Sequence, residues 1–410
     1  MECPVKLSDP LYAKVKPVFI ISKIFGLNQF SLPEPRYHVI NVVYSAALLL
    51  VILANIMYLV YDGNDLNSTQ NNVDTKSKLP VITIYVRMMF LILCNILFYV
   101  TCVITHKYIS AIFTCVNYID YNVQMFQDGP DQEKIQPHHH RIGDFLFTCL
   151  ILTSHLLGQV FRYLVSFYSS YFVFIYTIAS LTSILLELQF VILLINIRRS
   201  FCTLNSHLKR NKHGSFNAIV KKNIMFYDFK HTKSFLNYPF IKAMLRLHYY
   251  LCDVCSSINE VYGIKILLII GYDFLTITSI LFKLTSNLLS TSSNSSSSIS
   301  PVGNENFNMM AHIYLCLLKC FMLYLIVRTT DGVTKEAGKL LKISHKLQLK
   351  NDQANLNLEL QCFIQRLERH KISFTAYGFF PLDYTLLYTI IGAATTYWVI
   401  LVQFQLSYNI

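Results

Sequence analysis

Seven hydrophobic runs divide the chain, at about residues 39–61, 81–105, 143–165, 170–197, 263–284, 306–327 and 383–404. An α-helix rises ~1.5 Å per residue, so each run is long enough to cross a hydrocarbon core of ~30 Å. With 53% hydrophobic and 14% charged residues, this 410-residue chain is too apolar for a soluble domain. The sequence therefore predicts an all-α membrane protein with seven transmembrane helices.

Basic residues are distributed very unevenly between the loops that connect these runs. Twenty-eight lysines and arginines fall in residues 1–38, 106–142, 198–262 and 328–382, whereas two fall in the opposite set of loops. Because basic loops stay in the cytosol, we expect a cytosolic N-terminus and an extracellular C-terminus. The external segments are then 62–80, 166–169, 285–305 and 405–410. The net charge of +12 needs no nucleic-acid partner, because the basic loops face anionic membrane lipid.

Two glycosylation sequons agree with this orientation. Asn67 and Asn294 each begin an Asn-x-Ser/Thr sequence, and both fall in loops assigned to the outside. The Ser-rich stretch 290–300 in the second of these loops is typical of a flexible, exposed linker. We therefore expect both asparagines to accept glycans.

Motifs for catalysis or for metal binding are weak in this sequence. None of the eleven cysteines falls in an external loop, so no extracellular disulfide is expected. Cys252-x-x-Cys255 has no second pair to complete a zinc site, and the run His138–His140 is typical of a solvated loop. No nucleophile elbow, HExxH motif or glycine-rich phosphate loop is present. The sequence predicts no enzyme, no metal and no cofactor.

Two cytosolic loops, 198–262 and 328–382, are too long to be simple connections. Apolar residues recur in them at helical spacing, in three stripes: Leu251, Cys255, Ile258 and Tyr262; Val333, Ala337, Leu340, Leu341 and Leu347; and Leu356, Leu360, Phe363, Ile364 and Leu367. We expect helices that leave the membrane and pack into a cytosolic anchor domain. Amphipathic helices lying on the membrane surface are the alternative.

The last run, Tyr384–Phe404, reads YTLLYTIIGAATTYWVILVQF and combines small and polar residues without a charge. Such a helix suits close packing or a water-lined path better than lipid contact. Thr396-Tyr397, five apolar residues and then Gln403-Phe404 resemble the C-terminal signature of insect gustatory receptors. The preceding Phe374–Asp383 segment, FTAYGFFPLD, is similar to the segment that those receptors place just before it. The resemblance covers about 31 contiguous residues.

The resemblance implies a receptor in the plasma membrane of chemosensory neurons that is gated by a small-molecule tastant. It further implies a homo- or heterotetramer with other gustatory receptors, in which the last helix of each subunit lines one central pore for cations. Helical spacing along this run favours one stripe for the pore and gate: Thr396, Val399, Ile400, Gln403 and Phe404. Receptors of the sugar branch often carry an acidic residue directly after Thr-Tyr, where this chain has Trp398. A bitter or plant-derived tastant is therefore expected, with a sugar or polyol as the alternative.

Ionisable groups inside the predicted spans are functional candidates. Glu187 and Lys319 lie at matching depths and are predicted to pair, and Asp273 is assigned as a counter-ion for Arg87 or Arg162. Such pairs can either fix geometry or surround a ligand. Polar and aromatic residues in the outer halves of the second to sixth spans supply the candidate binding site. They are Tyr85, Arg87, His155, Gln159, Arg162, Tyr163, Tyr171, Phe174, Tyr176, Asp273, Asn308, His312 and Tyr314.

Three other classes of membrane protein compete with this interpretation. A G-protein-coupled receptor would have the reverse orientation, an acidic-Arg-aromatic triplet and an Asn-Pro-x-x-Tyr motif, and the triplet and motif are absent. A secondary transporter would favour broken helices and a repeat between halves, but no repeat is visible and seven spans divide poorly into halves. Insect odorant receptors share the inverted topology and the pore helix, and they are the nearest alternative.

Overall fold

The computed structural model describes residues 18, 20–27, 40, 42–51, 54, 79–125, 147–160, 170–210, 237–293, 302–349, 354–369 and 371–408. Its long elements are all helices: α3 (Leu79–Met125), α5 (Ser170–Arg210), α7 (Asn237–Ser293), α8 (Val302–Gln348), α9 (Ala354–Arg369) and α10 (Tyr384–Tyr408). Five of these (α3, α5, α7, α8 and α10) are long and apolar enough to cross a membrane. Two shorter apolar helices, Val42–Val51 and Phe147–Val160, fall in the other two predicted runs.

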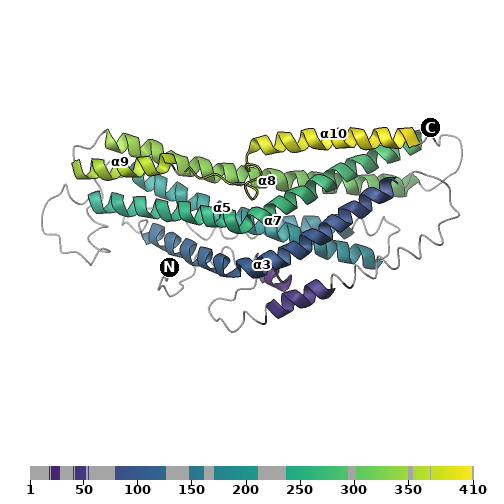
Figure 1. Ribbon diagram of the computed structural model, residues 1–410, viewed down its shortest axis with the longest axis horizontal. Coiled ribbons are helices and arrows are strands. Elements are labelled where there is room, and N and C mark those ends of the chain that lie inside the picture. The colour runs from purple at the N-terminus through teal and green to yellow at the C-terminus, as the bar shows by residue number, and fades with distance from the viewer. Residues whose placement is uncertain are drawn as a thin grey trace.

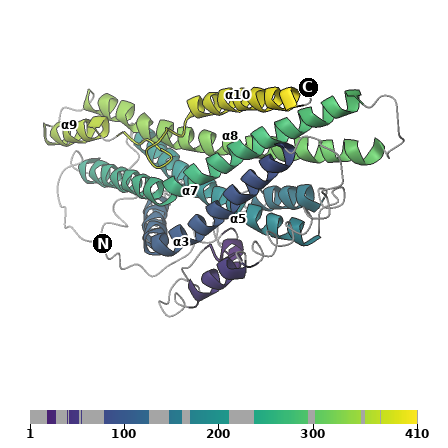
Figure 2. The same cartoon turned by 45° about the vertical axis from the view of Figure 1, so that its right-hand side comes forward.

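The long helices run roughly parallel to the long axis of an elongated molecule (Figure 1). Helix α9 and helix α10 lie at opposite ends of that axis, both alongside α8, and the turned view in Figure 2 shows the same arrangement. Helix α5 forms the centre of the bundle, because residues 181–194 are buried on every side of the helix. Helix α10 lies on the surface, with one side against α7 and α8.

Helices α7 and α8 continue well past the hydrophobic runs that predicted them. Helix α7 begins at Asn237, and its stripe Leu251, Cys255, Ile258 and Tyr262 is buried before the apolar run begins. Helix α8 continues to Gln348, and Leu340 on its extension is also buried. These extensions pack with α9 at one end of the molecule (Figure 1). The periodic stripes in the two long loops are thus parts of helices that bury their apolar side within the chain.

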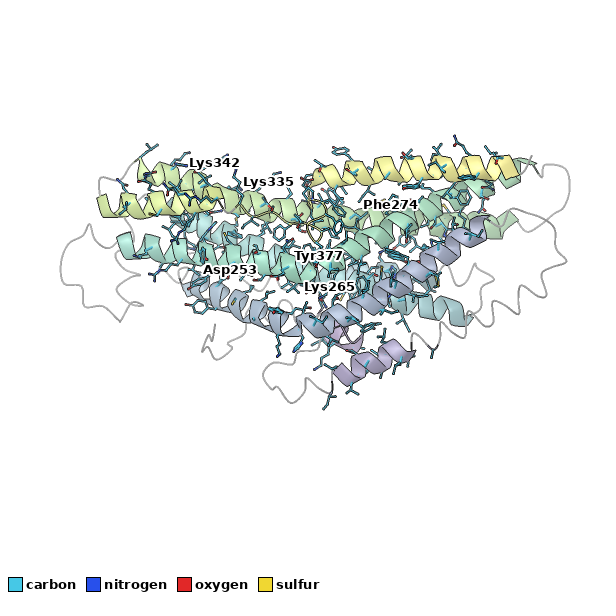
Figure 3. All side chains as sticks on the ribbon, in the orientation of Figure 1. Asp253, Lys265, Phe274, Lys335, Lys342 and Tyr377 are labelled. Carbon is cyan, nitrogen blue, oxygen red and sulfur yellow. The ribbon has the colours of Figure 1, made fainter. Side chains whose placement is uncertain are left out.

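A short non-helical segment, residues 371–383, joins α9 to α10 at mid-length of the bundle. It turns at Tyr377 and Gly378, whose φ angles are 51° and 80°, and Tyr377 is labelled in Figure 3. Glycine adopts this left-handed region without strain, whereas tyrosine is held there by its surroundings. Thr330 of α8 donates to the carbonyl of Leu382 at 2.6 Å, and Asn259 of α7 accepts from the amide of Thr375 at 2.8 Å. The segment therefore fixes the start of α10 to both neighbouring helices.

The first turn of α10 is capped by Asp383. Its carboxylate accepts a hydrogen bond from the amide of Thr385 at 2.9 Å, which satisfies one of the free donors at a helix N-terminus. From there Leu386, Ala394 and Gln405 are buried on the side that faces the bundle. Much of the rest of the helix, including Tyr388 and Phe404, is exposed in the single chain.

Candidate ligand cavity and its link to the last helix

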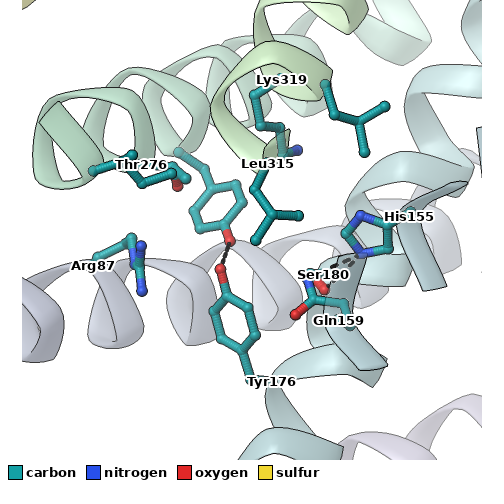
Figure 4. Close-up of a pocket in the computed structure, with 11 residues that line it drawn as sticks. Arg87, His155, Gln159, Tyr176, Ser180, Thr276, Leu315 and Lys319 are labelled. Carbon is teal, nitrogen blue, oxygen red and sulfur yellow. Dashed lines mark hydrogen bonds between the residues drawn. The ribbon is translucent and has the colours of Figure 1, made fainter. Parts of the chain in front are cut away.

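A cavity lies between the helices at the end of the bundle that holds α10. Its walls come from α3, the helix Phe147–Val160, α5, α7 and α8 (Figure 4). The lining residues are Arg87, His155, Gln159, Tyr176, Ser180, Tyr272, Thr276, Ile280, Leu315, Leu318 and Lys319. Two tyrosine rings and three aliphatic side chains form the apolar part, and the remaining groups are polar. Apolar walls with a few convergent polar groups are typical of small-molecule sites.

Hydrogen bonds order one part of this lining. The hydroxyl groups of Tyr176 and Tyr272 lie 2.9 Å apart and join α5 to α7. Across the cavity, Nε2 of His155 lies 3.0 Å from the Ser180 hydroxyl and 3.4 Å from the Gln159 amide nitrogen (Figure 4). The tyrosine pair and the histidine thus tie α5 to two different neighbours across the same cavity.

Three buried polar atoms at the cavity have no hydrogen-bond partner among the residues that the structure describes. They are Nε of Arg87, Oε1 of Gln159 and Oγ1 of Thr276. A buried polar group without a partner costs free energy, and bound water or a ligand can provide the missing partner. These atoms offer one donor, one acceptor and one hydroxyl that can act as either.

The cavity is small in this conformation. The space that water could occupy is about 10 Å³, which is close to the minimum for one molecule. Small-molecule pockets usually enclose several hundred Å³. A ligand of that kind would fit only after the surrounding side chains or helices separate.

Lys319 connects this cavity to a buried cluster of charges. Its Nζ lies 2.7 Å from Oδ1 of Asp273 on α7 and 3.4 Å from Oε1 of Glu187 on α5. Both acidic side chains are fully buried. The structure therefore brings Glu187 and Lys319 together as the sequence suggested. Asp273 pairs with Lys319 and not with Arg87, so that half of the assignment is wrong, whereas Arg162 lies outside the described residues.

Arg87 has a different environment. Its Nη1 donates a long hydrogen bond of 3.4 Å to the Ser279 hydroxyl, and its guanidinium carbon lies 5.6 Å from the centre of the Tyr176 ring. The residue is 6% exposed. Within the described part of the chain, no carboxylate lies within ion-pair distance of it.

The structure places only some of the predicted binding residues at the cavity. Arg87, His155, Gln159 and Tyr176 line it, whereas Asp273 stands behind Lys319. His312 and Tyr314 do not line it, and the Tyr314 hydroxyl instead donates to the carbonyl of Ser154 at 2.8 Å. Outside the described residues lie Arg162, Tyr163, Asn67 and Asn294, together with the side chains of Tyr85, Tyr171, Phe174 and Asn308.

Sequence reasoning missed several lining residues. Ser180, Tyr272, Ile280, Leu315 and Leu318 look like ordinary packing residues in their apolar runs. Leu315 lies one helical turn from Lys319 on the same side of the helix. The predicted depth of Lys319 could therefore have identified Leu315 as a lining residue. Nothing in the sequence alone distinguishes the others.

Helix α10 presents the predicted pore residues on its outer side. Thr396, Val399, Ile400, Gln403 and Phe404 are all exposed in the single chain. Leu401, on the opposite side of the helix from Gln403, is partly buried.

Two side-chain hydrogen bonds hold the inner side of α10 against the end of α7. Nε1 of Trp398 donates to the Thr285 hydroxyl at 2.9 Å, and the amide of Gln405 donates to the Ser286 hydroxyl at 2.7 Å. We call these two bonds the α7–α10 latch. One and a half to three helical turns earlier, the same α7 carries the cavity residues Thr276 and Ile280. Helix α7 therefore connects the cavity to the last helix.

Comparison with known proteins agrees with this architecture. The family model described as 7tm chemosensory receptor matches residues 15–408. Gustatory receptor 28b of Drosophila melanogaster is 31% identical over 164 residues, which cover 40% of this chain and 34% of the relative. The gustatory receptor for bitter taste 66a of the same species is 29% identical over 168 residues, which cover 41% of this chain and 31% of the relative. The chain thus matches about a third of the length of these curated relatives.

Two solved structures share the fold along nearly the whole chain. The insect olfactory receptor OR5 from Machilis hrabei in complex with eugenol has a TM-score of 0.60 at 15% identity and covers 97% of this chain and 100% of its own. The structure of OR5 described without that ligand has a TM-score of 0.61 at 12% identity, with 96% and 98% covered. The chain belongs to the 7tm chemosensory receptor family and is homologous to the gustatory receptors of Drosophila melanogaster.

Proposed function

We propose that this chain is a gustatory receptor that works as a tastant-gated, non-selective cation channel. The observation that carries the proposal is the connection of a buried cavity to α10 through a single helix, α7. The family match supports a chemoreceptor, and the shared fold with an olfactory receptor whose structure contains eugenol supports a small-molecule ligand.

In this mechanism, a tastant binds in the cavity and favours a conformation in which the cavity is larger. The cavity, at about 10 Å³, is too small for a tastant in the present conformation. A ligand can shift the equilibrium only by its difference in affinity for the two states. The ligand would separate α7 from α5, since the pair Tyr176–Tyr272 spans the gap between these helices.

Movement of α7 would then release α10. Thr285 and Ser286 lie beyond the cavity residues on one rigid helix, so a tilt of α7 at the cavity displaces the latch. With the latch broken, α10 can move away from the centre of the assembly. The capped segment around Asp383 stays attached to α8 through Thr330 and serves as the pivot.

The pore would form between four copies of α10. Its exposed side carries Gln403 and Ile400, and four copies of these residues would close the outer end as a constriction that excludes water. No carboxylate lies on α10 itself. Asp383, repeated around the tetramer at the inner mouth, is the nearest group that could attract cations, although its carboxylate also caps the helix.

A bitter or plant-derived compound is the ligand class that we favour. Trp398 occupies the position where an acidic residue would indicate a sugar receptor, and here its indole nitrogen bonds to Thr285. The cavity also has aromatic walls, which suit planar plant metabolites better than polyols.

A screen with current recording tests the proposal. Cells that express this chain would be exposed to a panel of bitter compounds, sugars and polyols while membrane current is recorded. Replacing Ile280 with Trp fills the cavity and should reduce ligand-evoked current without loss of surface expression. Replacing exposed Leu317 with Trp is the matched control, because that side chain lies on the outer surface of α8. An equal loss of current in both variants would show that the cavity is not the site that detects the ligand.

A further inference from the structure

The predicted membrane-spanning runs contain more positive than negative charge. Five basic residues fall within these runs. Only two acidic residues, Glu187 and Asp273, fall in their interior, because Asp144 and Asp383 lie at the edges of their runs; among the basic residues Lys265 and Lys283 also lie near run edges, which leaves three interior cations. A cation in a low-dielectric region normally pairs with an anion or reaches water. At least some of these cations therefore need a partner that the interior of the runs does not supply.

Both interior carboxylates are already engaged by one cation. Lys319 lies 2.7 Å from Asp273 and 3.4 Å from Glu187. Arg87, the other cation that lines the cavity beside Lys319, has no carboxylate partner among the described residues and is almost completely buried. Its contacts are a long hydrogen bond to Ser279 and the face of the Tyr176 ring. Neither contact neutralises the charge.

The guanidinium also has one unused hydrogen-bond donor. Its Nε has no partner in the described structure, and Gln159 and Thr276 each contribute a further unpartnered atom to the same cavity. Figure 4 shows Arg87 on one side of the Tyr176 ring and Gln159 on the other. A guanidinium binds a carboxylate through two parallel hydrogen bonds, and this pairing is stronger than a neutral one.

We propose that the ligand of this cavity is an anion, and specifically a small aromatic carboxylate whose acid group binds Arg87. This assignment rests on the proposed function, since it names the ligand class of the same cavity. The ring of the ligand packs against Tyr176 and the aliphatic wall of Leu315, Leu318 and Ile280. The carboxylate supplies the negative charge that Arg87 lacks, and Thr276 donates its hydroxyl to a remaining oxygen.

The test uses three molecules that differ only in the polar group: cinnamate, cinnamamide and methyl cinnamate. A carboxyl group of this kind is ionised at pH 7.5, whereas the amide and the ester are neutral. Thermal stabilisation of the purified full-length chain measures binding, and ligand-evoked current measures activation. We expect cinnamate to stabilise the chain at concentrations at least about tenfold lower than the amide or ester, the advantage of a charge-assisted hydrogen bond. Equal or better stabilisation by the neutral molecules, or none by cinnamate, overturns the proposal.

Two substitutions at Arg87 assign the preference to that residue. Arg87→Gln should remove the advantage of cinnamate over cinnamamide, and Arg87→Lys should retain part of it because the charge remains. Arg328→Gln is the control, because Arg328 also lies over a tyrosine ring, at 5.9 Å, but is exposed and outside the cavity. An unchanged preference in Arg87→Gln would overturn the assignment. If Arg87→Gln fails to fold, Arg87→Lys can be compared with the native chain instead. A reduced preference for cinnamate over cinnamamide in Arg87→Lys would support the assignment, and an unchanged preference would overturn it.

Measuring binding and current separately distinguishes failure of the anion-site proposal from failure of the channel proposal. Stabilisation by cinnamate that depends on Arg87 but evokes no current would support the anion site and contradict the channel mechanism. Current evoked by neutral compounds alone would support the channel and contradict the anion site.

Discussion

Replacing Lys319 with Met should destabilise this receptor more than any other single loss of charge within its helices. At an effective dielectric constant of ~20, a unit-charge pair at 2.7 Å attracts by about 6 kcal/mol and one at 3.4 Å by about 5 kcal/mol. Desolvation offsets much of this attraction, but removing one member of a buried pair still costs about 3–5 kcal/mol. Here a single substitution leaves two buried carboxylates facing each other without a cation. A loss at the upper end of that range is comparable with the whole stability of many domains.

The arrangement of the cluster predicts an order among its variants. Glu187→Gln should be the mildest, because Lys319 keeps its shorter contact to Asp273. Asp273→Asn should be more severe. The double variant Glu187→Gln with Lys319→Met should recover little, since Asp273 stays unpaired, whereas adding Asp273→Asn should recover most of the loss.

Surface labelling and the melting temperature of the detergent-solubilised chain would measure these effects. Lys335→Met is the matched control on the same helix, because Lys335 pairs with Asp331 at 2.7 Å in an exposed position. Exposed ion pairs add little to stability, so this variant should reach the surface normally. Normal surface delivery of Lys319→Met, or an equal loss in Lys335→Met, would refute the argument.

Three further outcomes are expected. Thr285→Val removes one of the two acceptors of the α7–α10 latch and should produce current without ligand, whereas a channel that stays closed without ligand would exclude this role. Gln403→Ala should raise leak or alter ion preference while Leu401→Met is tolerated, and the reverse result would place the pore on the other side of α10. Glycosidase treatment should shift the mobility of the chain through Asn67 and Asn294, while a tag after the first residue stays hidden in intact cells; surface labelling of that tag would reverse the topology.

Much of the fold could be predicted because its cause is local. Apolar runs of more than twenty residues define the helices, and periodic stripes such as Leu251–Tyr262 indicated that α7 begins before its apolar run. The matched depths of Glu187 and Lys319 placed the two residues at the same level of the bundle. Depth along a helix follows directly from residue number.

The rotation of one helix against another does not follow from residue number, and the errors come from it. Asp273 was assigned to an arginine because the sequence gives its depth but not the direction that it faces. The rotation of α7 also decides that Tyr272, one residue away, faces the cavity and bonds to Tyr176, and the sequence does not show this. The bond of Gln405 to Ser286 was not predicted either, because the apolar run ends at Phe404 although the helix continues to Tyr408. Each of these features depends on contacts between segments far apart in the chain.

The central claim is that the chain itself forms the ion pathway that its ligand opens. Recording from excised outside-out patches of cells that express it, with no GTP in the pipette, tests this claim most directly. The account predicts unitary currents that appear within milliseconds of agonist application, reverse near 0 mV with mixed cations, and change in amplitude in Gln403→Ala. Agonist responses that occur only in intact cells, or unitary currents unaffected by any substitution on the exposed side of α10, would contradict it.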